Sequence, residues 1–292
     1  RVPTPWTEVA SRLGNEPQVL CVVNTRADAR ALASLVSGAR QLTALMCAEH
    51  RSAVLADIQQ RLRHGEDVRV VSTQLVEAGV DIDFPVVWRA LAGLDSIAQA
   101  AGRCNREGRL ERGLVHVFVP PSRSPAGHLR QGEQATRSLL AATGGAGLHE
   151  PQGYRRYFEL LYSIKAELDR QAILTLLVRD ARQLQFGFRT AGERFRMIDD
   201  EGSTVVVPYG EGRRHIEALR RLAARGERPD RLMLRRLQRY TVTLRRFEIE
   251  QLRREQGVDE LVDGLSAVHH EFYSDDAGVS LAGRDFSLGL NV

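Results

Sequence analysis

Short apolar runs alternate with helix-patterned stretches between residues 18 and 119, and this alternation limits the fold more than any other feature. The apolar runs lie at residues 18–24, 41–46, 68–72, 86–91 and 114–120. Amphipathic stretches lie between them, after Thr25, from about His50 to His64, and over residues 97–109. Such alternation predicts an α/β fold in which helices cover a parallel sheet and ligands lie at the carboxyl ends of the strands. We expect Asn24 and Thr73 at that edge.

The remaining chain is expected to form a linker, a helical region and a second module. The stretch PPSRSPAG at residues 120–127 indicates an exposed linker. Beyond it, we expect helix over residues 154–184, two short strands within 186–210 around DDEGS, a helix over 211–225 and a strand over 239–249. The predicted segments are residues 1–120, a linker and helical region over 121–185, and a smaller α+β C-terminal domain over 186–292.

Charge, cysteine spacing and hydropathy limit the partners that this chain can have. Lysine and arginine total 41 against 37 acidic residues, a net charge of +4, so nucleic-acid contact must come from local clusters such as residues 213–240. The cysteines Cys21, Cys47 and Cys104 lack metal-site spacing, and the neighbours His269, His270 and Glu271 are interpreted as structural, so no metal site is predicted. The sequence has no run of eighteen apolar residues, and we expect a cytoplasmic protein without a membrane partner.

The stretch QAAGRCNREG, residues 99–108, predicts a helix with two chemically different faces. At about 100° per residue, one face carries Gln99, Gly102, Arg103 and Arg106. Two guanidinium groups on one face favour anion binding, although such a face taken alone is more often solvated surface.

Three segments together resemble the second RecA-like lobe of superfamily 2 helicases. VLCVVNTRADA at 19–29 is similar to motif IV, VVSTQLVEAGVDID at 70–83 to motif V, and IAQAAGRCNREGR at 97–109 to motif VI. The resemblance covers residues 15–120. The wording AGVDIDF followed by IAQAAGRCNREG most resembles the helicase-nuclease family of type I CRISPR interference. That resemblance implies a RecA-like sheet, then a linker and a smaller C-terminal domain.

The resemblance implies that motif VI acts on ATP. Arg103 and Arg106 are expected to reach the γ-phosphate, where an arginine finger is worth about 10³ to 10⁵ in rate. Gln99 would hydrogen-bond the phosphate or the attacking water, and Gly102 would permit close approach. Asp81 of motif V is expected at the ribose.

The same resemblance implies DNA contacts in motifs IV and V. Thr25, Asn24 and Thr73 are expected to hold the DNA backbone, although Thr25 is equally well interpreted as a helix N-cap. Glu77 and Gly79 complete motif V and are expected to shape the loop that links nucleotide to DNA. Arginines of the basic region are further candidates, namely Arg213, Arg214, Arg235, Arg236 and Arg239. We expect the C-terminal module to pack over the strand-end edge and help to enclose a single strand.

Several expected parts are not in this sequence. It contains no G-x-x-x-x-G-K-[ST] loop, no D-E-x-H or D-E-x-D box and no HD nuclease cluster. The ligands of Mg²⁺ are therefore expected outside this chain, which begins at Arg1 and is interpreted as a piece of a longer protein that does not hydrolyse ATP by itself. The implied partners are the first RecA-like lobe and HD nuclease of the same protein, single-stranded DNA, and the CRISPR surveillance complex on target DNA.

Two alternatives stay open. The chain could come from another superfamily 2 helicase with an accessory domain. It could also be a non-catalytic nucleic-acid-binding or adaptor module that keeps the fold. The sequence upstream of Arg1 distinguishes the three hypotheses.

Overall fold

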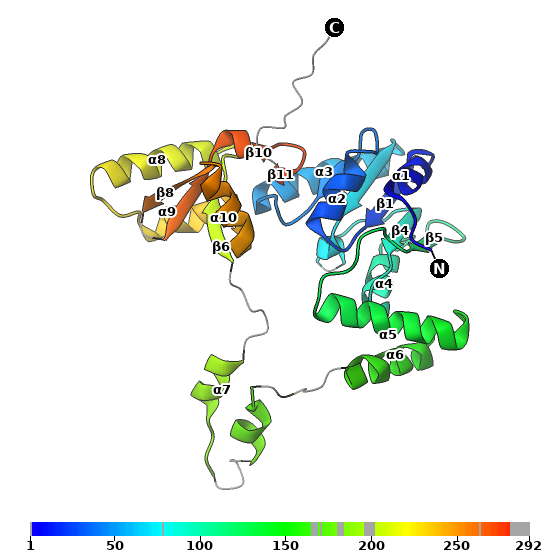
Figure 1. The fold of residues 1–292 in the computed structure, drawn as a ribbon. Helices are drawn as coiled ribbons and strands as arrows, with labels where there is room; N and C mark the ends of the chain where they lie inside the picture. Colours follow the sequence, from blue (N-terminus) through cyan, green and yellow to red (C-terminus); the bar gives the residue numbers. More distant parts are fainter. Residues whose placement is uncertain are drawn as a thin grey trace. The chain divides into compact units, whose positions relative to one another are not determined.

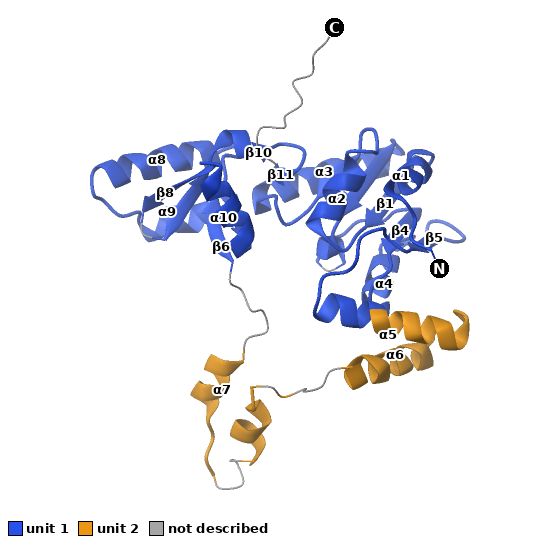
Figure 2. Cartoon of the chain, viewed as in Figure 1, with its two compact units in different colours: residues 1–133, 202–292 blue, residues 134–201 orange. Residues whose placement is uncertain are grey.

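The computed structural model describes residues 2–77, 79–164, 169, 171–179, 184–195, 202–262 and 264–280. The chain divides into two compact units (Figure 2). Unit 1 comprises Arg1–Glu133 and Gly202–Val292, and unit 2 comprises residues 134–201. None of the described helices is both long and apolar enough to cross a membrane.

A five-stranded parallel sheet forms the first part of unit 1, with strand order β2-β3-β1-β4-β5. Figure 1 labels β1, β4 and β5 of this sheet. The strands are β1 Gln18–Val22, β2 Arg40–Leu42, β3 Val68–Ser72, β4 Val86–Ala90 and β5 Leu114–Phe118. The helices are α1 Trp6–Gly14, α2 Arg26–Ala33, α3 Ala48–His64 and α4 Leu94–Ala101. The predicted α/β fold and all five predicted strands are confirmed, although β2 is shorter than expected.

Alternating side chains of the central strand build two hydrophobic cores. Val19 and Cys21 pack with residues of α1 and α2 on one face. Leu20 and Val22 pack on the other face with residues that include Ile58 of α3 and Ala100 of α4. Because β1 is buried on both faces, its sequence is a continuous apolar run, as is typical of a central parallel strand. Helix α1 was not among the predicted elements.

The motif VI helix ends earlier than the sequence pattern predicted. Helix α4 stops at Ala101, with Gly102 as its C-cap. Phe84 then pairs with Cys104 in a parallel bridge, and the Phe84 N–H donates to Arg103 O at 2.9 Å. Because of this pairing the residues after Ala101 are not helical. The prediction that Gln99, Gly102, Arg103 and Arg106 form one helical stripe is therefore wrong.

The second part of unit 1 is a mixed α+β module. Its sheet has the order β7-β6-β9-β8, with β6–β7 and β8–β9 antiparallel and β6–β9 parallel. The strands are β6 Ser203–Val206, β7 Thr241–Leu244, β8 Val258–Val262 and β9 Leu265–Val268, followed by the hairpin β10 Tyr273–Ser274 and β11 Gly278–Val279. The helices are α8 Gly212–Ala224, α9 Arg231–Leu237 and α10 Arg246–Arg254. The predicted smaller α+β module is confirmed.

Two element predictions in this region are partly wrong. The strand predicted over 239–249 ends at Leu244, because Arg245 caps α10 and its N–H donates to Glu248 Oε2 at 2.7 Å. The first of the two strands predicted within 186–210 is instead the helix α7 Phe188–Arg194, and the second is β6. Residues 199–201 of the expected turn lie outside the described residues.

Unit 2 is helical where it is described. It contains most of α5 His128–Thr143, then α6 Pro151–Ile164, the π-helical turn η2 Thr175–Arg179 and α7. Helix α6 confirms the first half of the helix predicted over 154–184, whereas α5 was not predicted. Parts of the second half, residues 165–168, 170 and 180–183, lie outside the described residues.

Candidate functional site

Asn24 and Thr73 lie at the carboxyl ends of β1 and β3, as the sequence predicts, and this end of the sheet is called the carboxyl edge below. Both are buried, with 4% and 6% of their surfaces exposed. Asn24 Nδ2 donates to Leu91 O at 2.9 Å and to Ser124 Oγ at 3.2 Å. Its amide is therefore engaged inside the chain, and its contact with DNA stays a prediction.

Thr25 acts as a helix cap. Its Oγ1 accepts a hydrogen bond from the Asp28 N–H at 3.0 Å, at the first turn of α2. The N-cap interpretation is thus confirmed, and the predicted DNA contact of Thr25 remains compatible with it because the residue is only half-buried.

A buried arginine connects motifs IV and V with the first turn of α4, the helix that leads into motif VI. Arg89 of β4 is fully buried, and its guanidinium NH1 donates to Asn24 Oδ1 at 2.7 Å. Its NH2 donates to Ser96 Oγ of α4 at 2.7 Å and lies 3.1 Å from Glu77 Oε1. Ser96 Oγ also donates to Glu77 Oε1 at 2.7 Å. Glu77, predicted to shape motif V, thus points its carboxylate into the protein.

Motif V runs from the carboxyl end of β3 to the amino end of β4. After β3, its loop begins at Thr73, forms the short 3-10 helix η1 Gln74–Val76, and turns at Gly79, where a φ of +71° favours glycine. Asp81 and Asp83 follow immediately before β4. Motif V therefore joins the two opposite ends of the sheet, and the end near Asp81 is called the amino edge below.

The side chain of Arg103 binds backbone carbonyl groups of motif V. Its Nε donates to Val76 O at 2.8 Å and its NH2 donates to Glu77 O at 2.9 Å. Burial lowers the pKa of Arg103, and the nearby charge of Arg106 lowers it further. One of the two predicted finger arginines therefore holds the loop, while the like charges of the pair repel each other.

Arg106 is the more available of the two. Its NH1 lies 2.9 Å from Asp81 Oδ1, and the two side chains are 44% and 81% exposed. Asp83 fixes the backbone, because its carboxylate accepts from the N–H groups of Arg106 at 2.7 Å and Glu107 at 3.3 Å. The amino edge therefore presents a guanidinium whose only carboxylate contact among the described residues is an exposed one.

Gln99 and Gly102, the other two residues that motif VI assigns to ATP, are both exposed. Gln99 is exposed in the last turns of α4, and Gly102 is exposed as the C-cap of that helix. Their predicted contacts with the phosphate stay predictions.

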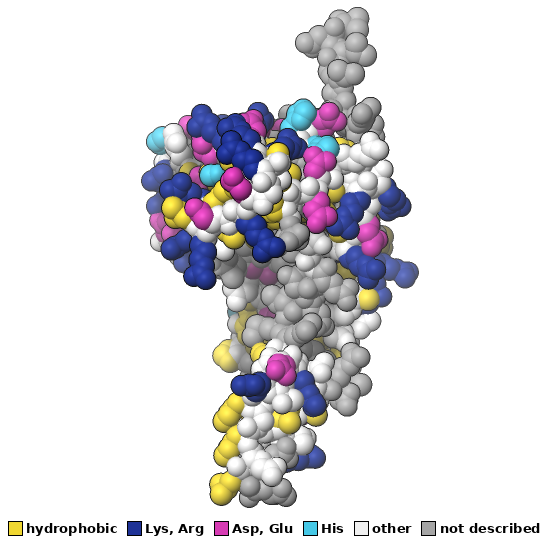
Figure 3. Space-filling model, turned by 90° about the vertical axis from the view of Figure 1, so that its left-hand side faces the viewer, with side chains coloured by type: hydrophobic (Ala, Val, Ile, Leu, Met, Phe, Trp, Pro, Cys, Tyr) yellow, Lys and Arg dark blue, Asp and Glu magenta, His cyan; other side chains and the backbone are white. Residues whose placement is uncertain are grey.

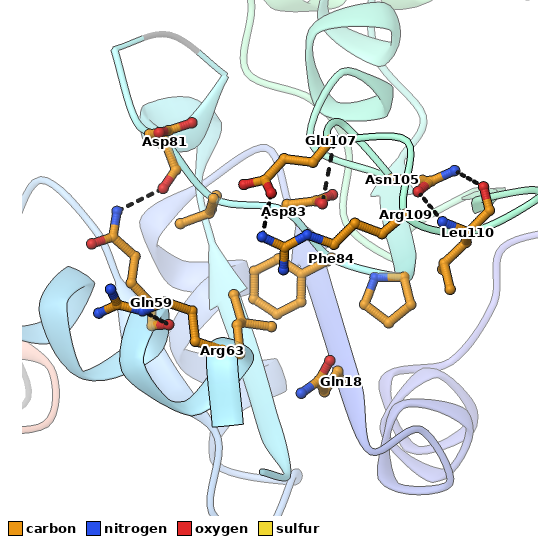
Figure 4. A pocket seen from close by; sticks show the side chains of 13 residues that line it. Gln18, Gln59, Arg63, Asp81, Asp83, Phe84, Asn105, Glu107, Arg109 and Leu110 are labelled. Atoms are coloured by element: carbon orange, nitrogen blue, oxygen red, sulfur yellow. Dashed lines mark hydrogen bonds and ion pairs between the residues drawn. The ribbon is translucent and has the colours of Figure 1, made fainter. Parts of the chain in front are cut away.

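A pocket of about 380 Å³ adjoins Asp81 at the amino edge (Figure 4). It is lined by Gln18, Gln59, Leu62, Arg63, Asp81, Ile82, Asp83, Phe84, Pro85, Asn105, Glu107, Arg109 and Leu110. Gln59 Nε2 donates to Asp81 O at 2.7 Å, and Arg109 pairs with Glu107. The sequence analysis missed Gln59 and Arg63, which stand outside the motifs; their spacing of four residues on α3 places them on one helix face.

The predicted basic residues of the C-terminal module have different surroundings. Arg235 and Arg236 are exposed in the last turn of α9, and neither forms a salt bridge within the described part of the chain. Arg239 instead lies 2.6 Å from Glu49 of α3. Figure 3 shows arginine side chains interspersed with acidic ones over the C-terminal module. Arg235 and Arg236 thus remain candidates for phosphate contact, while Arg239 connects the module to the lobe.

The C-terminal module packs against the carboxyl edge of the first sheet. Leu45 and Cys47, which follow β2, share a hydrophobic core with residues of this module. Arg26 NH1 contacts both carboxylate oxygens of Glu248 at 2.9 and 2.8 Å. Gly278 fits so closely that a Cβ would lie 2.3 Å from Leu45 O. The expected packing of the module over the strand ends is confirmed.

His50 lies in the same contact. The ring, which is buried, accepts from Tyr273 O–H at Nδ1 and donates from Nε2 to Asp275 O, both at 2.8 Å, in the tautomer that satisfies both partners. It stacks on Tyr209 with ring centroids 4.2 Å apart. Burial lowers the pKa of His50, while the backbone and charge of Asp275 oppose this change.

Within the described residues, no group of three or more histidine, cysteine or acidic side chains could hold a metal ion. His269 Nε2 lies 2.8 Å from Asp259 Oδ2. Although burial acts in the opposite direction, hydrogen bonds from His269 and Arg220 lower the pKa of Asp259. His269 thus has a structural contact.

Known proteins resemble this chain in part of its sequence and in its fold. Residues 15–109 match the family model of the C-terminal region of the CRISPR-associated nuclease/helicase Cas3. A Cas3 nuclease/helicase from Haloferax volcanii is 42% identical over 71 residues, which are 20% of this chain and 8% of that protein. Crystal structures of T. fusca Cas3 with ATP and with AMPPNP share the fold with TM-scores of 0.57 and 0.55 at 16% identity.

The chain spans well under half of these relatives. It covers 38% of the T. fusca Cas3 chain with ATP, while that match includes 92% of the present chain. Residues 15–109 are thus similar in sequence to the C-terminal region of the CRISPR-associated nuclease/helicase Cas3, and the chain shares the fold of T. fusca Cas3.

Proposed function

We propose that this chain is the C-terminal part of an ATP-dependent DNA helicase and translocase with nuclease activity that acts in CRISPR interference. The observation that carries this proposal is the pair Arg106–Asp81 at the amino edge, which is separated along motif V from Thr73 at the carboxyl edge by residues 74–80. A helicase needs one surface for the nucleotide and another for DNA. This arrangement provides a candidate for each.

The residues at the amino edge suit an ATP phosphate. Arg106 can exchange its exposed partner Asp81 for a phosphate oxygen, because a guanidinium forms forked hydrogen bonds to such groups. Arg103 has two donors on backbone carbonyls, which fixes the loop that carries Arg106. Structures of T. fusca Cas3 with ATP and AMPPNP support nucleotide binding in this family. The Mg²⁺ ligands would come from a first RecA-like lobe outside this chain.

The proposed partners are single-stranded DNA, the remaining domains of the same protein and a surveillance complex. A structure of a CRISPR RNA-guided surveillance complex before nicking contains a similar fold, with a TM-score of 0.50 over 89% of this chain. That likeness supports the last partner. We further propose a cytoplasmic location. No observation favours a different helicase or a non-catalytic module over this function.

The test is the ATPase rate of the full-length protein with Arg106→Ala. Removing transition-state charge stabilisation should lower kcat by about 10³ or more, while single-strand affinity stays within a few-fold. Arg155→Ala is the control, because Arg155 is an exposed arginine of α6 that pairs with Glu159 and does not line the pocket at the amino edge. The isolated chain should show no turnover. An Arg106→Ala enzyme as active as the Arg155→Ala control would contradict the proposal.

DNA contact by the C-terminal module has its own test. Arg235→Gln combined with Arg236→Gln should weaken single-strand binding and reduce the slope of log affinity against log salt by about 1.4, or about 0.7 for each phosphate that is no longer neutralised. The measurement is a salt titration of binding to a labelled single strand. An unchanged slope would remove these two arginines from the interface.

A further inference from the structure

Arg89 is a buried charge that the proposed reaction does not use. Its side chain is fully buried near the carboxyl end of β4, and it donates to Asn24 Oδ1, Ser96 Oγ and the backbone oxygens of Val22 and Ala90. Burying a guanidinium is costly, and a well-packed apolar side chain often gives equal or greater stability at such a position. Stability alone therefore does not account for an arginine here.

Glu77 transmits the contacts of Arg89 to the surface. Its side chain faces inward, where Oε1 accepts from Ser96 at 2.7 Å and lies 3.1 Å from Arg89 NH2. Its backbone oxygen accepts from Arg103 NH2 at 2.9 Å. One residue thus joins the buried arginine to the exposed arginine loop.

The geometry of Arg103 makes it sensitive to the position of Glu77. Its Nε and NH2 donate to the consecutive carbonyls of Val76 and Glu77, and both bonds are below 3.0 Å. Hydrogen bonds weaken steeply with distance and misalignment, so a displacement of one carbonyl breaks the paired contact. Arg103 would then lose its fixed orientation, and the loop that carries Arg106 would lose its anchor.

We propose that the buried Arg89–Glu77 ion pair is a positioning device that holds the backbone of motif V in place for Arg103, and so sets the arginine loop from the carboxyl edge of the sheet. The consequence for ATP turnover rests on the proposed function. The structural part of the inference does not. Asn24 and Ser96 complete the device, because they fix the guanidinium of Arg89 from β1 and α4.

The first experiment measures backbone hydrogen exchange in the purified chain. Glu77→Gln removes the negative charge of the ion pair, and Arg89→Lys replaces the forked guanidinium with a single ammonium group. Both variants should speed exchange in peptides covering residues 73–77 and 102–106 by at least about tenfold. Glu248→Gln is the matched control, because it breaks the ion pair with Arg26 in the contact with the C-terminal module. The control should affect residues 26–30 and leave both motif peptides unchanged.

Two outcomes of this experiment overturn the proposal. In the first, neither Glu77→Gln nor Arg89→Lys changes exchange in residues 102–106. In the second, all three variants speed exchange throughout the chain equally, which is the behaviour of a general loss of stability.

The second experiment is a double-mutant cycle on ATPase in the full-length protein. If Glu77 acts through Arg103, Glu77→Gln should lower kcat in the parent and have almost no further effect in an Arg103→Ala background. Effects that multiply in the double variant contradict positioning through Arg103. If the parent lacks ATPase activity, the proposed function fails, while the exchange experiment still decides the positioning role.

Discussion

The two ends of the parallel sheet differ in how much of their chemistry the chain satisfies by itself. At the carboxyl edge, Asn24 is bonded to its own chain and Arg26 is paired with Glu248 of the C-terminal module. At the amino edge, Arg106 has the exposed Asp81 as its partner, and Asp81 lines a pocket. The difference is what the proposed function expects if the amino edge binds a partner outside the chain, whereas the carboxyl edge is already covered by the C-terminal module.

The largest expected effect separates the two edges by function. In the full-length protein, Thr73→Val should loosen DNA and reduce ATPase only through weaker stimulation by DNA, whereas Arg106→Ala should reduce kcat by orders of magnitude. Saturating single-stranded DNA should therefore largely restore the ATPase rate of the Thr73→Val variant and leave the Arg106→Ala variant inactive. The measurement is ATPase rate against DNA concentration for both variants. If DNA restores the ATPase rate of Arg106→Ala instead, the assignment of the nucleotide to the amino edge and of DNA to the carboxyl edge is wrong.

The second effect concerns the link between the edges. Arg89→Met leaves Glu77 buried without its cationic partner, and breaking a buried ion pair in this way costs about 3–5 kcal/mol in the free energy of unfolding. Combining it with Glu77→Met should recover much of that loss, because no charge is then left unpaired. Denaturant unfolding of the purified chain measures both. A double variant no more stable than Arg89→Met would show that the pair is not the origin of the loss.

A smaller effect is expected where the C-terminal module covers the carboxyl edge. Glu248→Gln weakens two contacts with Arg26 and one with the Arg245 N–H, so we expect a loss of about 1–3 kcal/mol. Exposed Glu250 on the same helix provides the control, since Glu250→Gln removes only a surface pair with Arg246. Equal losses for both variants would show that burial of the Arg26 pair adds nothing.

The smallest effect is a pH dependence of the same contact. The folded pKa of His50 is below its ordinary value of 6.5, so the folded state binds the proton less readily than the unfolded state. Its contribution is complete above about pH 6.5 and is lost as pH falls below that value, with a slope of at most about 1.4 kcal/mol per pH unit. His50→Gln should flatten the stability profile between pH 7 and pH 5, as measured by thermal unfolding in a buffer series.

The titration of Asp259 does not overlap with that of His50 in the stability profile between pH 7 and pH 5. Its pKa is lowered from 3.8, so its stabilising contribution is lost only in more acidic solution. A pH profile of His50→Gln that matched the parent between pH 7 and pH 5 would assign the titration to another group.

The sequence was most informative where local pattern and tertiary structure agree. The apolar run of β1 predicted its burial, and Thr25 predicted the start of α2, because strand periodicity and capping are local properties. The resemblance assigned Asp81 to the ribose and Arg106 to the γ-phosphate of ATP, and these contacts stay predictions. The ion pair between the two side chains at 2.9 Å, across 25 positions of sequence, was not predicted.

Other features could not be read from local pattern. The end of α4 depends on the bridge between Phe84 and Cys104, which no helical periodicity reveals. The inward orientation of Glu77 depends on Arg89, whose charge within an apolar strand gave no signal of its partner. The helix α10 begins inside a stretch that has strand-like alternation, since Glu248 caps it and packs against Arg26 from a distant part of the chain.

The position of β5 at the end of the sheet order bears on how this protein can be handled in solution. Among the described strands β5 pairs only with β4, and its Leu114 and Val117 side chains are exposed. A flat, apolar edge strand is a template for a strand from another molecule, and such pairing leads to aggregation. Val117→Lys places a charge on that edge without touching either hydrophobic core around β1, and should keep concentrated samples monodisperse.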